Sequence, residues 1–488
     1  MERVRFAPSP TGALHIGGLR TALFNYAYAK KNEGVFVLRI EDTDQNRYVG
    51  KAEEYILNSL KWCGIEPDES VDKPGEYGPY RQSERLDVYQ REVEKLIREG
   101  KAYYAFDTTE SLNELRKHAE ANGHSFKYGF HNRKELNNSL DLDVDEINKR
   151  KANGYVVRLK IEAGTTFCTD EVRGNIHFDN AELEDKILIK ADGYPTYHFA
   201  NVVDDHHMKI TTVIRGEEWL SSLPVHIQIY KAFGWDIPKF AHLPLILKPT
   251  GKGKLSKRDG DLGGFPIFPL VFNESPGFKE KGFLAEGLVN TLMLLGWSHE
   301  GEDELLSLDE FVKKFEFDQV QKGGARFDFE KAKWINQQYI KNKDVDEIVD
   351  LIVKGGYLDT IDKSILHKAV TIIHERLVLL SDVVNETRCL FHDPEGYDER
   401  VIKKISEKGM AKVLNFLGDQ WFRQSSFVKE DLKRFCDNEE IGFGVAMQTL
   451  RLILVGELKG PDVFEILKFL ENNVIYRRLD LLKNHLEN

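Results

Sequence analysis

Residues 3–40 of the chain read RVRFAPSPTGALHIGGLRTALFNYAYAKKNEGVFVLRI. The opening RVRFAP predicts a strand, Leu19 to Lys31 predict a helix, and VFVLRI is an apolar run typical of a strand that is covered on both faces. A strand, a helix and a second buried strand in this order predict a βαβ unit with parallel strands. We therefore expect a doubly wound α/β domain at the start of the chain.

The loop ahead of the expected helix carries residue types that suit a phosphate site. Helix N-termini expose unpaired N–H groups and a partial positive charge, and Gly17 and Gly18 would let a nucleotide approach them. His15 stands just before them and could stabilise charge that develops at an α-phosphate. Pro8, Pro10 and Gly12 would shape the loop. The alternative from these residues alone is a tight strand-to-helix turn with an incidental histidine.

A second segment, KPTGKGKLSKRDGD at residues 248–261, concentrates positive charge among glycines. Standing alone, it indicates a solvated charge run. Together with the helix entrance, it predicts a clamp whose lysines close over a triphosphate and neutralise a pyrophosphate leaving group.

The composition separates a mixed first part from a helical last part. The length of 488 residues predicts two to four domains. Thirteen of the fifteen prolines lie at or before Pro276, which favours helices in the rest of the chain. There, the apolar residues alternate steps of four and three, as on one face of a helix; they are Leu366, Val370, Ile373, Leu377 and Leu380.

Other features of the composition exclude whole classes of protein. The four cysteines lie far apart without a C-x-x-C pair, which argues against a disulfide framework or a thiolate metal site. The N-terminus MERVRFAPSP lacks the apolar stretch of a secretory signal, and we find no apolar run long enough to span a membrane. We therefore expect a cytoplasmic chain. The net charge of -12 disfavours non-specific nucleic-acid binding but leaves room for local basic patches.

Two signatures and several longer strings resemble one family. His15-Ile16-Gly17-Gly18 is similar to the HIGH signature of class I aminoacyl-tRNA synthetases, and KLSKR at residues 254–258 to their KMSKS signature. The strings RFAPSPTGALHIGGLRTALFNY, LRIEDTD, YGPYRQSER, DGYPTYHFANVVDDHHM and KLSKRDGD resemble bacterial-type glutamyl-tRNA synthetases in the family's order, over essentially the whole chain. The chain departs from the two signatures at two positions. Gly18 replaces the final histidine of HIGH, as is common in this family, and Leu255 replaces the methionine of KMSKS.

This resemblance implies a reaction and an architecture. Glutamyl-adenylate would form from L-glutamate and ATP with Mg²⁺, and the glutamyl group would then move to tRNA(Glu), releasing AMP and pyrophosphate overall. The implied fold is a doubly wound Rossmann-like catalytic domain with an inserted α+β domain, followed by all-α anticodon-binding domains, in a chain that is usually a monomer. The expected parts are 1–102 and 191–247 for the catalytic halves, 103–190 for the inserted acceptor-stem-binding domain, 248–330 for the KLSKR loop and a stem-contact helical domain, and 331–488 for the anticodon-binding region. Strand-like YVVRLKI and ILIKADGYPTYHF and helical SLNELRKHAEA mark the insertion.

The resemblance also implies the site residues. The expected ATP site comprises Pro8, His15, Gly17, Gly18, Lys254, Leu255, Ser256, Lys257 and Arg258, with His15, Lys254 and Lys257 catalytic. The expected glutamate pocket comprises Arg5, Ser9, Glu41, Tyr197, Asn201 and Arg215. Arg5 and Arg215 would hold the side-chain carboxylate because guanidinium–carboxylate pairs are strong and directional, and Glu41 would face the ammonium. Without the resemblance, Arg5 would be a half-exposed strand residue and Glu41 a surface acid.

Metal binding and tRNA reading complete the expectations. The run DDHH at residues 204–207 has the chemistry of metal ligands, but in the family it borders the substrate pocket, so we expect no catalytic metal there. Relatives with zinc carry a C-x-C pair where this chain has KAYYAFDT, so we expect no zinc. Arg376 is the candidate for contact with the anticodon, where bases would be met by stacking and edge hydrogen bonds.

Four alternatives compete with this interpretation. Glutaminyl-tRNA synthetase shares both signatures, but its anticodon part is built of β-barrels. A truncated relative that modifies a tRNA base lacks the anticodon part altogether. A small-molecule nucleotidyltransferase would need no helical C-terminal mass, and a tRNA-binding scaffold with a decayed catalytic domain would not keep the polar groups of both phosphate motifs.

Overall fold

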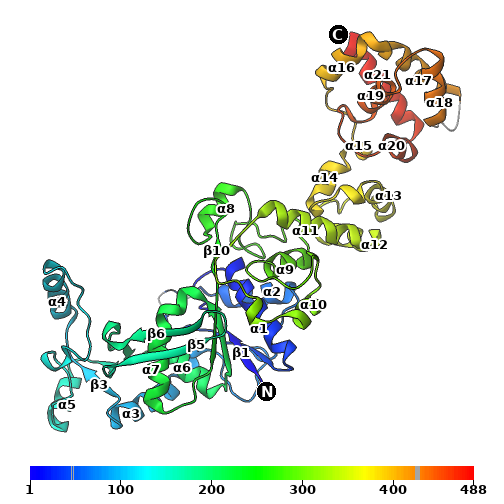
Figure 1. The fold of residues 1–488 in the computed structure, drawn as a ribbon. Helices are drawn as coiled ribbons and strands as arrows, with labels where there is room; N and C mark the ends of the chain where they lie inside the picture. The colour runs from blue at the N-terminus through cyan, green and yellow to red at the C-terminus, as the bar shows by residue number, and fades with distance from the viewer. Residues whose placement is uncertain (45–46, 48, 424–428, 488) are drawn as a thin grey trace. The chain divides into compact units, whose positions relative to one another are not determined.

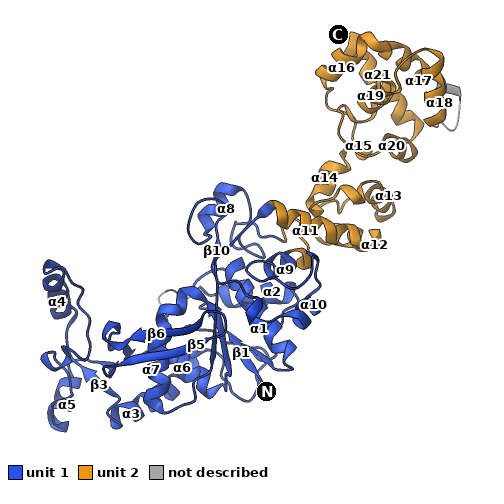
Figure 2. Ribbon diagram, viewed as in Figure 1, with its two compact units in different colours: residues 1–278, 288–329 blue, residues 279–287, 330–488 orange. Residues whose placement is uncertain are grey.

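The structure is a computed structural model that describes residues 1–44, 47, 49–423 and 429–487. Figure 1 shows the course of the chain from the N- to the C-terminus. The chain divides into two compact units, residues 1–278 with 288–329 and residues 279–287 with 330–488 (Figure 2). The first unit mixes strands and helices, whereas the described residues of the second form helices and turns.

The first unit opens with the predicted βαβ unit. Strand β1 (Arg3–Phe6) pairs in parallel with β2 (Val35–Leu38), and helix α1 (Ile16–Lys31) connects them. All four residues of β1 are buried, as expected for a parallel strand with both faces covered. The prediction is confirmed, although the helix begins earlier than the expected Leu19.

A four-stranded sheet in the order β6-β5-β9-β8 forms the rest of the α/β core. Its strands are β5 (Thr165–Asp170), β6 (Gly174–Asp179), β8 (Thr212–Gly216) and β9 (Lys239–Leu243). Strands β8 and β9 are parallel, and their register sets Arg215 opposite His242. The backbone N–H of Thr211 donates to the Arg3 carbonyl at 2.9 Å, so β8 starts beside β1. Strands β5 and β6 lie within the range expected for the insertion, yet they extend this sheet.

A smaller antiparallel sheet in the order β3-β4-β7 belongs to the expected insertion. Its elements are β3 (Ala102–Ala105), β4 (Val156–Leu159), β7 (Ile187–Ile189), α4 (Thr109–Ala121) and α5 (Val144–Lys151). The expectation that all of ILIKADGYPTYHF is strand-like was wrong, because β7 ends at Ile189 and helix α6 (Tyr197–His207) begins within the run. Pro195, which has no N–H to donate to a ladder, separates the two.

Further elements complete the first unit. They are α2 (Ala52–Trp62), α3 (Leu86–Arg98), α7 (Leu223–Phe233), β10 (Ile246–Leu247), α8 (Lys257–Gly263), α9 (Ala285–Met293), α10 (Leu308–Lys314) and β11 (Ala325–Arg326). Strands β10 and β11 pair in parallel, which ties the entrance of the KLSKR segment to the end of this unit.

The second unit confirms the helical prediction for the end of the chain. Its helices are α11 (Phe329–Asn342), α12 (Val345–Lys354), α13 (Lys363–Ile373), α14 (Val383–Glu386), α15 (Arg388–Phe391), α16 (Glu399–Ile405), α17 (Ala411–Arg423), α18 (Lys429–Asn438), α19 (Phe443–Val455), α20 (Val463–Phe469) and α21 (Asn472–Glu487). Residues 424–428 and 488 of the expected anticodon-binding region lie outside the described residues. Of the described helices in the whole chain, none has both the length and the apolar character that crossing a bilayer requires.

The single helix expected over Leu366 to Leu380 is interrupted. Helix α13 ends at Ile373, and a 3₁₀ turn over His374–Arg376 follows. All five apolar residues of the pattern are nevertheless buried. A 3₁₀ turn repeats every three residues, so it can return an apolar side chain to the same core after the α-helix has ended.

Candidate active site

One cavity of about 540 Å³ in the first unit is lined by both predicted constellations. The lining residues from the ATP prediction are Pro8, His15, Gly17, Gly18, Lys254, Leu255, Ser256 and Lys257. Those from the glutamate prediction are Arg5, Ser9, Glu41, Tyr197, Asn201 and Arg215. Arg258 is an exposed residue of α8 outside this lining. The fold therefore brings together segments that lie far apart in the sequence.

His15 caps the helix that enters the cavity. Its Nδ1 accepts hydrogen bonds from the backbone N–H groups of Gly17 at 3.0 Å and Gly18 at 3.2 Å, so the proton of the neutral ring is on Nε2, which remains a donor. The surrounding cleft desolvates the ring, and the nearby Lys254 ammonium adds to this effect, so the pKa of His15 is lowered. A Cβ at position 17 would lie only 2.8 Å from this ring, a reason for Gly17 that the sequence pattern did not suggest.

The lysine-rich segment borders the same cavity from β10. Leu255 donates its N–H to the Ile246 carbonyl at 2.8 Å, and the Lys254 ammonium pairs with Glu218 at 2.8 Å. Ser256 then caps α8, donating its backbone N–H to Asp259 at 3.0 Å. Lys257 begins that helix and lines the cavity. Two lysines are thereby anchored at the cavity by local backbone structure and by one carboxylate.

Arg5 belongs to a buried network of charges. Its Nε and Nη2 donate to the Asp205 carboxylate at 3.0 and 3.2 Å, and Asp205 also accepts from Arg39 at 2.7 Å. Burial opposes the charge of Asp205, but the two guanidiniums outweigh it and lower the pKa of this carboxyl. The positive charge of Arg5 is therefore already balanced within the protein.

Glu41 lies at the edge of this network. Its Oε1 accepts from Arg39 at 3.0 Å and from the Asn201 amide at 2.9 Å, and within the described residues its Oε2 stays available as an acceptor. Burial raises the pKa of Glu41 despite Arg39 and Arg5. A cation that reaches Oε2 would favour the ionised form of this carboxyl.

Arg215 is buried without such a partner. Only 4% of the residue is exposed, and among the described residues no carboxylate oxygen lies within 4.0 Å of its guanidinium nitrogens. Its Nη1 lies 3.2 Å from the Tyr197 hydroxyl, to which it donates. Burial lowers the pKa of Arg215. A buried unpaired cation is costly, so this position is suited to an anionic ligand group.

Known families and proteins match this chain over most of its length. The family described as "tRNA synthetases class I (E and Q), catalytic domain" matches residues 2–334, and the one described as "Anticodon binding domain" matches residues 336–482. The chain is 48% identical to the glutamate–tRNA ligase of Christiangramia forsetii, over 98% of this chain and 97% of that protein. It is 49% identical to the glutamate–tRNA ligase of Flavobacterium johnsoniae, over 96% of each.

The chain belongs to the glutamate–tRNA ligases of class I. A crystal structure of a glutamate tRNA ligase from Elizabethkingia meningosepticum in complex with its amino acid is similar over 98% of each chain, with a TM-score of 0.93 and 44% identity. The mixed α/β catalytic region with parallel strands and the helical C-terminal region predicted from the sequence are the fold of this family.

The run DDHH has structural partners in this ligase. Asp204 accepts from Arg85 at 2.6 Å and Asp205 from Arg5 and Arg39, while the His206 ring stacks on Trp235 with centroids 3.7 Å apart. Within the described residues, no three His, Cys, Asp or Glu side chains form a group that could hold a metal ion. The two aspartates therefore serve the arginine network.

Several functional neighbours escaped the sequence interpretation. Asp205, Glu218 and His242 contact predicted site residues. One signal was available: Tyr197, Asn201 and Asp205 follow one another at steps of four, which puts them on one face of a helix. We had expected a strand at the start of this segment, so the helical spacing was missed.

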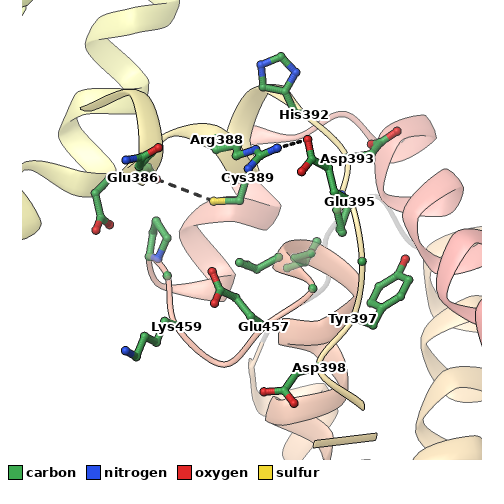
Figure 3. A pocket seen from close by; sticks show the side chains of 18 of the residues that line it. Glu386, Arg388, Cys389, His392, Asp393, Glu395, Tyr397, Asp398, Glu457 and Lys459 are labelled. Atoms are coloured by element: carbon green, nitrogen blue, oxygen red, sulfur yellow. Dashed lines mark hydrogen bonds and ion pairs between the residues drawn. The ribbon is translucent and has the colours of Figure 1, made fainter. Parts of the chain in front are cut away.

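A second cavity, of about 660 Å³, lies within the second unit (Figure 3). Its lining residues include Arg376. The Arg376 Nε donates to Glu386 at 2.5 Å. In Figure 3, Arg388 forms an ion pair with Glu395 on the wall of this cavity. The buried guanidinium of Arg478 in α21 donates to the carbonyls of Cys389 and His392 at 2.7 Å each, and so holds the wall in place.

Proposed function

We propose that glutamyl-adenylate forms in the cavity of the first unit, from L-glutamate and the magnesium complex of ATP. Membership of the family gives the overall activity, which is the aminoacylation of tRNA(Glu) with glutamate. In the proposed step, a carboxylate oxygen of glutamate attacks the α-phosphorus, the bond to the β-phosphate oxygen breaks, and pyrophosphate leaves. No proton needs to move, so catalysis depends on positioning and on charge stabilisation.

The ATP side of the proposal rests on His15 and the lysines. The Nε2–H of His15 and the N-terminus of α1 would stabilise the charge on the α-phosphate. Lys254 and Lys257 would neutralise the departing pyrophosphate, with Lys254 leaving Glu218 to do so, and Arg258 would act from the rim. Pro8, Gly17, Gly18, Leu255 and Ser256 would shape the walls.

The glutamate side rests on one observation above the others, the buried and unpaired guanidinium of Arg215. We assign to Arg215 the side-chain carboxylate of glutamate. The Tyr197 hydroxyl and Nη1 of Arg5 would help to hold it, because the described hydrogen bonds of Arg5 use its Nε and Nη2. Glu41 would accept from the substrate ammonium through Oε2, oriented by Asn201, and Ser9 would complete the pocket. Glutamine would leave the Arg215 charge unpaired.

The remaining assignments concern tRNA. Residues 103–190 would contact the acceptor stem, 248–330 the adjoining stem, and 331–488 the anticodon, with Arg376 as the base-contacting residue. We propose that the chain acts as a cytoplasmic monomer and without zinc. The cavity at Arg376 offers a guanidinium together with polar and apolar lining residues, which would meet an unstacked base by stacking and edge hydrogen bonds.

Lys257→Ala tests the ATP side. It should slow glutamate-dependent ATP–pyrophosphate exchange, measured with saturating tRNA(Glu), by about 10²–10³, the scale for losing one positioned stabilising group. Lys252→Ala removes the same charge from the same loop outside the cavity lining, and it should leave the rate within about twofold of the parent. Equal rates for parent and Lys257→Ala would remove Lys257 from its role, and exchange without added glutamate would overturn the proposal.

A further inference from the structure

The Arg215 guanidinium is held by four acceptors that carry no charge. Its Nε donates to His242 Nε2 at 3.0 Å, and its Nη2 donates to the Trp219 carbonyl at 3.3 Å. Its Nη1 lies 3.2 Å from both the Tyr197 hydroxyl and His226 Nδ1. Neutral acceptors orient a cation without neutralising it, so the full charge remains available to a ligand.

His242 can accept from Arg215 Nε because of its own hydrogen bond with Asp170. His242 Nδ1 lies 2.6 Å from Asp170 Oδ2, and both residues are at most 1% exposed. A carboxylate only accepts, so the Nδ1 proton is held between the two and Nε2 must carry the lone pair. Desolvation lowers the pKa of His242 despite Asp170, which keeps the ring neutral. The register of β8 and β9 and the parallel bridge from β5 to β9 place Arg215, His242 and Asp170 next to one another.

We propose that Asp170 and His242 are positioning residues for the amino-acid substrate. Asp170 fixes the tautomer of His242, and His242 then fixes the rotation of Arg215, so that its remaining N–H faces the substrate carboxylate. This inference rests on the proposed contact of Arg215 with glutamate. The counter-charge for Arg215 thus lies one histidine away in Asp170, far enough to leave the site open for the ligand.

The isosteric substitution Asp170→Asn tests the tautomer of His242. Asp170 Oδ1 accepts three backbone N–H groups, from Val172 at 3.0 Å, Arg173 at 2.8 Å and His242 at 3.3 Å. In Asp170→Asn, the amide oxygen must therefore stay at this position, and the NH₂ group must face His242 Nδ1. His242 would then carry its proton on Nε2 and oppose the Nε–H of Arg215, donor against donor.

The experiment measures aminoacylation by the full chain at saturating tRNA(Glu). Asp170→Asn should raise KM for glutamate by about 10- to 100-fold, the scale of one charged hydrogen bond, with KM for ATP within about twofold. His242→Gln, whose amide can donate to Asp170 and accept from Arg215, should raise KM for glutamate less than His242→Leu does. If Asp170→Asn fails to fold, this pair of variants decides the question.

Asp185→Asn is the matched control. Asp185 is also a buried carboxylate, which accepts from a tyrosine, an arginine and a backbone N–H outside the cavity lining, so its variant should leave KM for glutamate within about twofold. A normal KM for glutamate in Asp170→Asn, alongside a raised one in Arg215→Gln, would overturn the positioning role alone. A normal KM in Arg215→Gln would instead overturn the proposed Arg215 contact.

Discussion

Arg5 and Arg215 are the same residue type in one cavity, but their neighbours give them different electrostatic roles. Arg5 is balanced by Asp205 at 3.0 Å, whereas the described carboxylates leave Arg215 unpaired. We therefore propose that Arg215 contributes more than Arg5 to holding the substrate carboxylate, and the expectation that both arginines hold it stays a prediction. Arg5 also supports the buried network, because it shares Asp205 with Arg39.

Substitution of each arginine should separate its effect on glutamate binding from its effect on the stability of the fold. Arg215→Gln should lower kcat/KM for glutamate by an amount equivalent to about 3–5 kcal/mol of transition-state stabilisation, the scale for the loss of a buried charge partner. It should also reduce the preference for glutamate over glutamine. Arg5→Gln should reduce thermal stability as well, because the buried Asp205 carboxylate would lose one of its two guanidinium partners and keep Arg39 alone. The measurement is kcat/KM for both amino acids at saturating ATP and tRNA(Glu), with melting curves. An unchanged glutamate-to-glutamine ratio in Arg215→Gln would contradict the assignment.

At the scale of elements, the residue that caps helix α1 is also the proposed catalytic histidine. The N-cap is His15, and its ring satisfies two backbone N–H groups of the first turn. From the sequence, we expected His15 in the loop ahead of this helix. The structure makes it a structural residue as well, because unpaired N–H groups at a helix start are destabilising.

Two variants of His15 should separate these roles. His15→Ala removes both the cap and the Nε2 donor, so it should cost about 1 kcal/mol of unfolding free energy and slow adenylate formation. His15→Asn keeps a good cap, but its shorter amide places no donor at the position of Nε2, so it should keep the stability and still lose activity. Urea unfolding and ATP–pyrophosphate exchange measure the two effects. Parent-like activity in His15→Asn would show that the histidine serves the helix alone.

At the scale of the whole molecule, we propose that the two units recognise different substrates. The first contains the cavity proposed for glutamate and ATP, and the second contains a separate cavity lined by Arg376. A change in the second cavity should therefore alter tRNA use without altering the amino-acid pocket.

Arg376→Ala tests this division. It should raise KM for tRNA(Glu) by about tenfold or more, as for the loss of one base contact worth about 1–3 kcal/mol. KM for glutamate should stay within about twofold. Arg400→Ala, an exposed arginine outside the cavity lining, is the control. The assignment would fall if both variants showed the same KM for tRNA(Glu), measured by aminoacylation with tRNA transcripts.

Local patterns carried much of the prediction. The βαβ unit followed from an apolar run and a helix entrance, and the helical end from few prolines and a spacing of three and four. The predicted site residues that line the cavity followed from two signature segments and a family resemblance. Such features are encoded within short stretches, because periodicity and turn residues act over one or two turns of chain.

The pairing of charges was decided by the tertiary structure. Arg5 with Asp205, Lys254 with Glu218, and Arg215 with His242 join residues from different elements. Sequence alone determined that arginines and carboxylates would be present near the cavity. Which arginine kept an unpaired charge depended on the register of β8 against β9 and on the face of α6 that turns inward. The physical reason is that a buried charge is set by neighbours within a few ångströms, and the fold chooses those neighbours without regard to their distance along the chain.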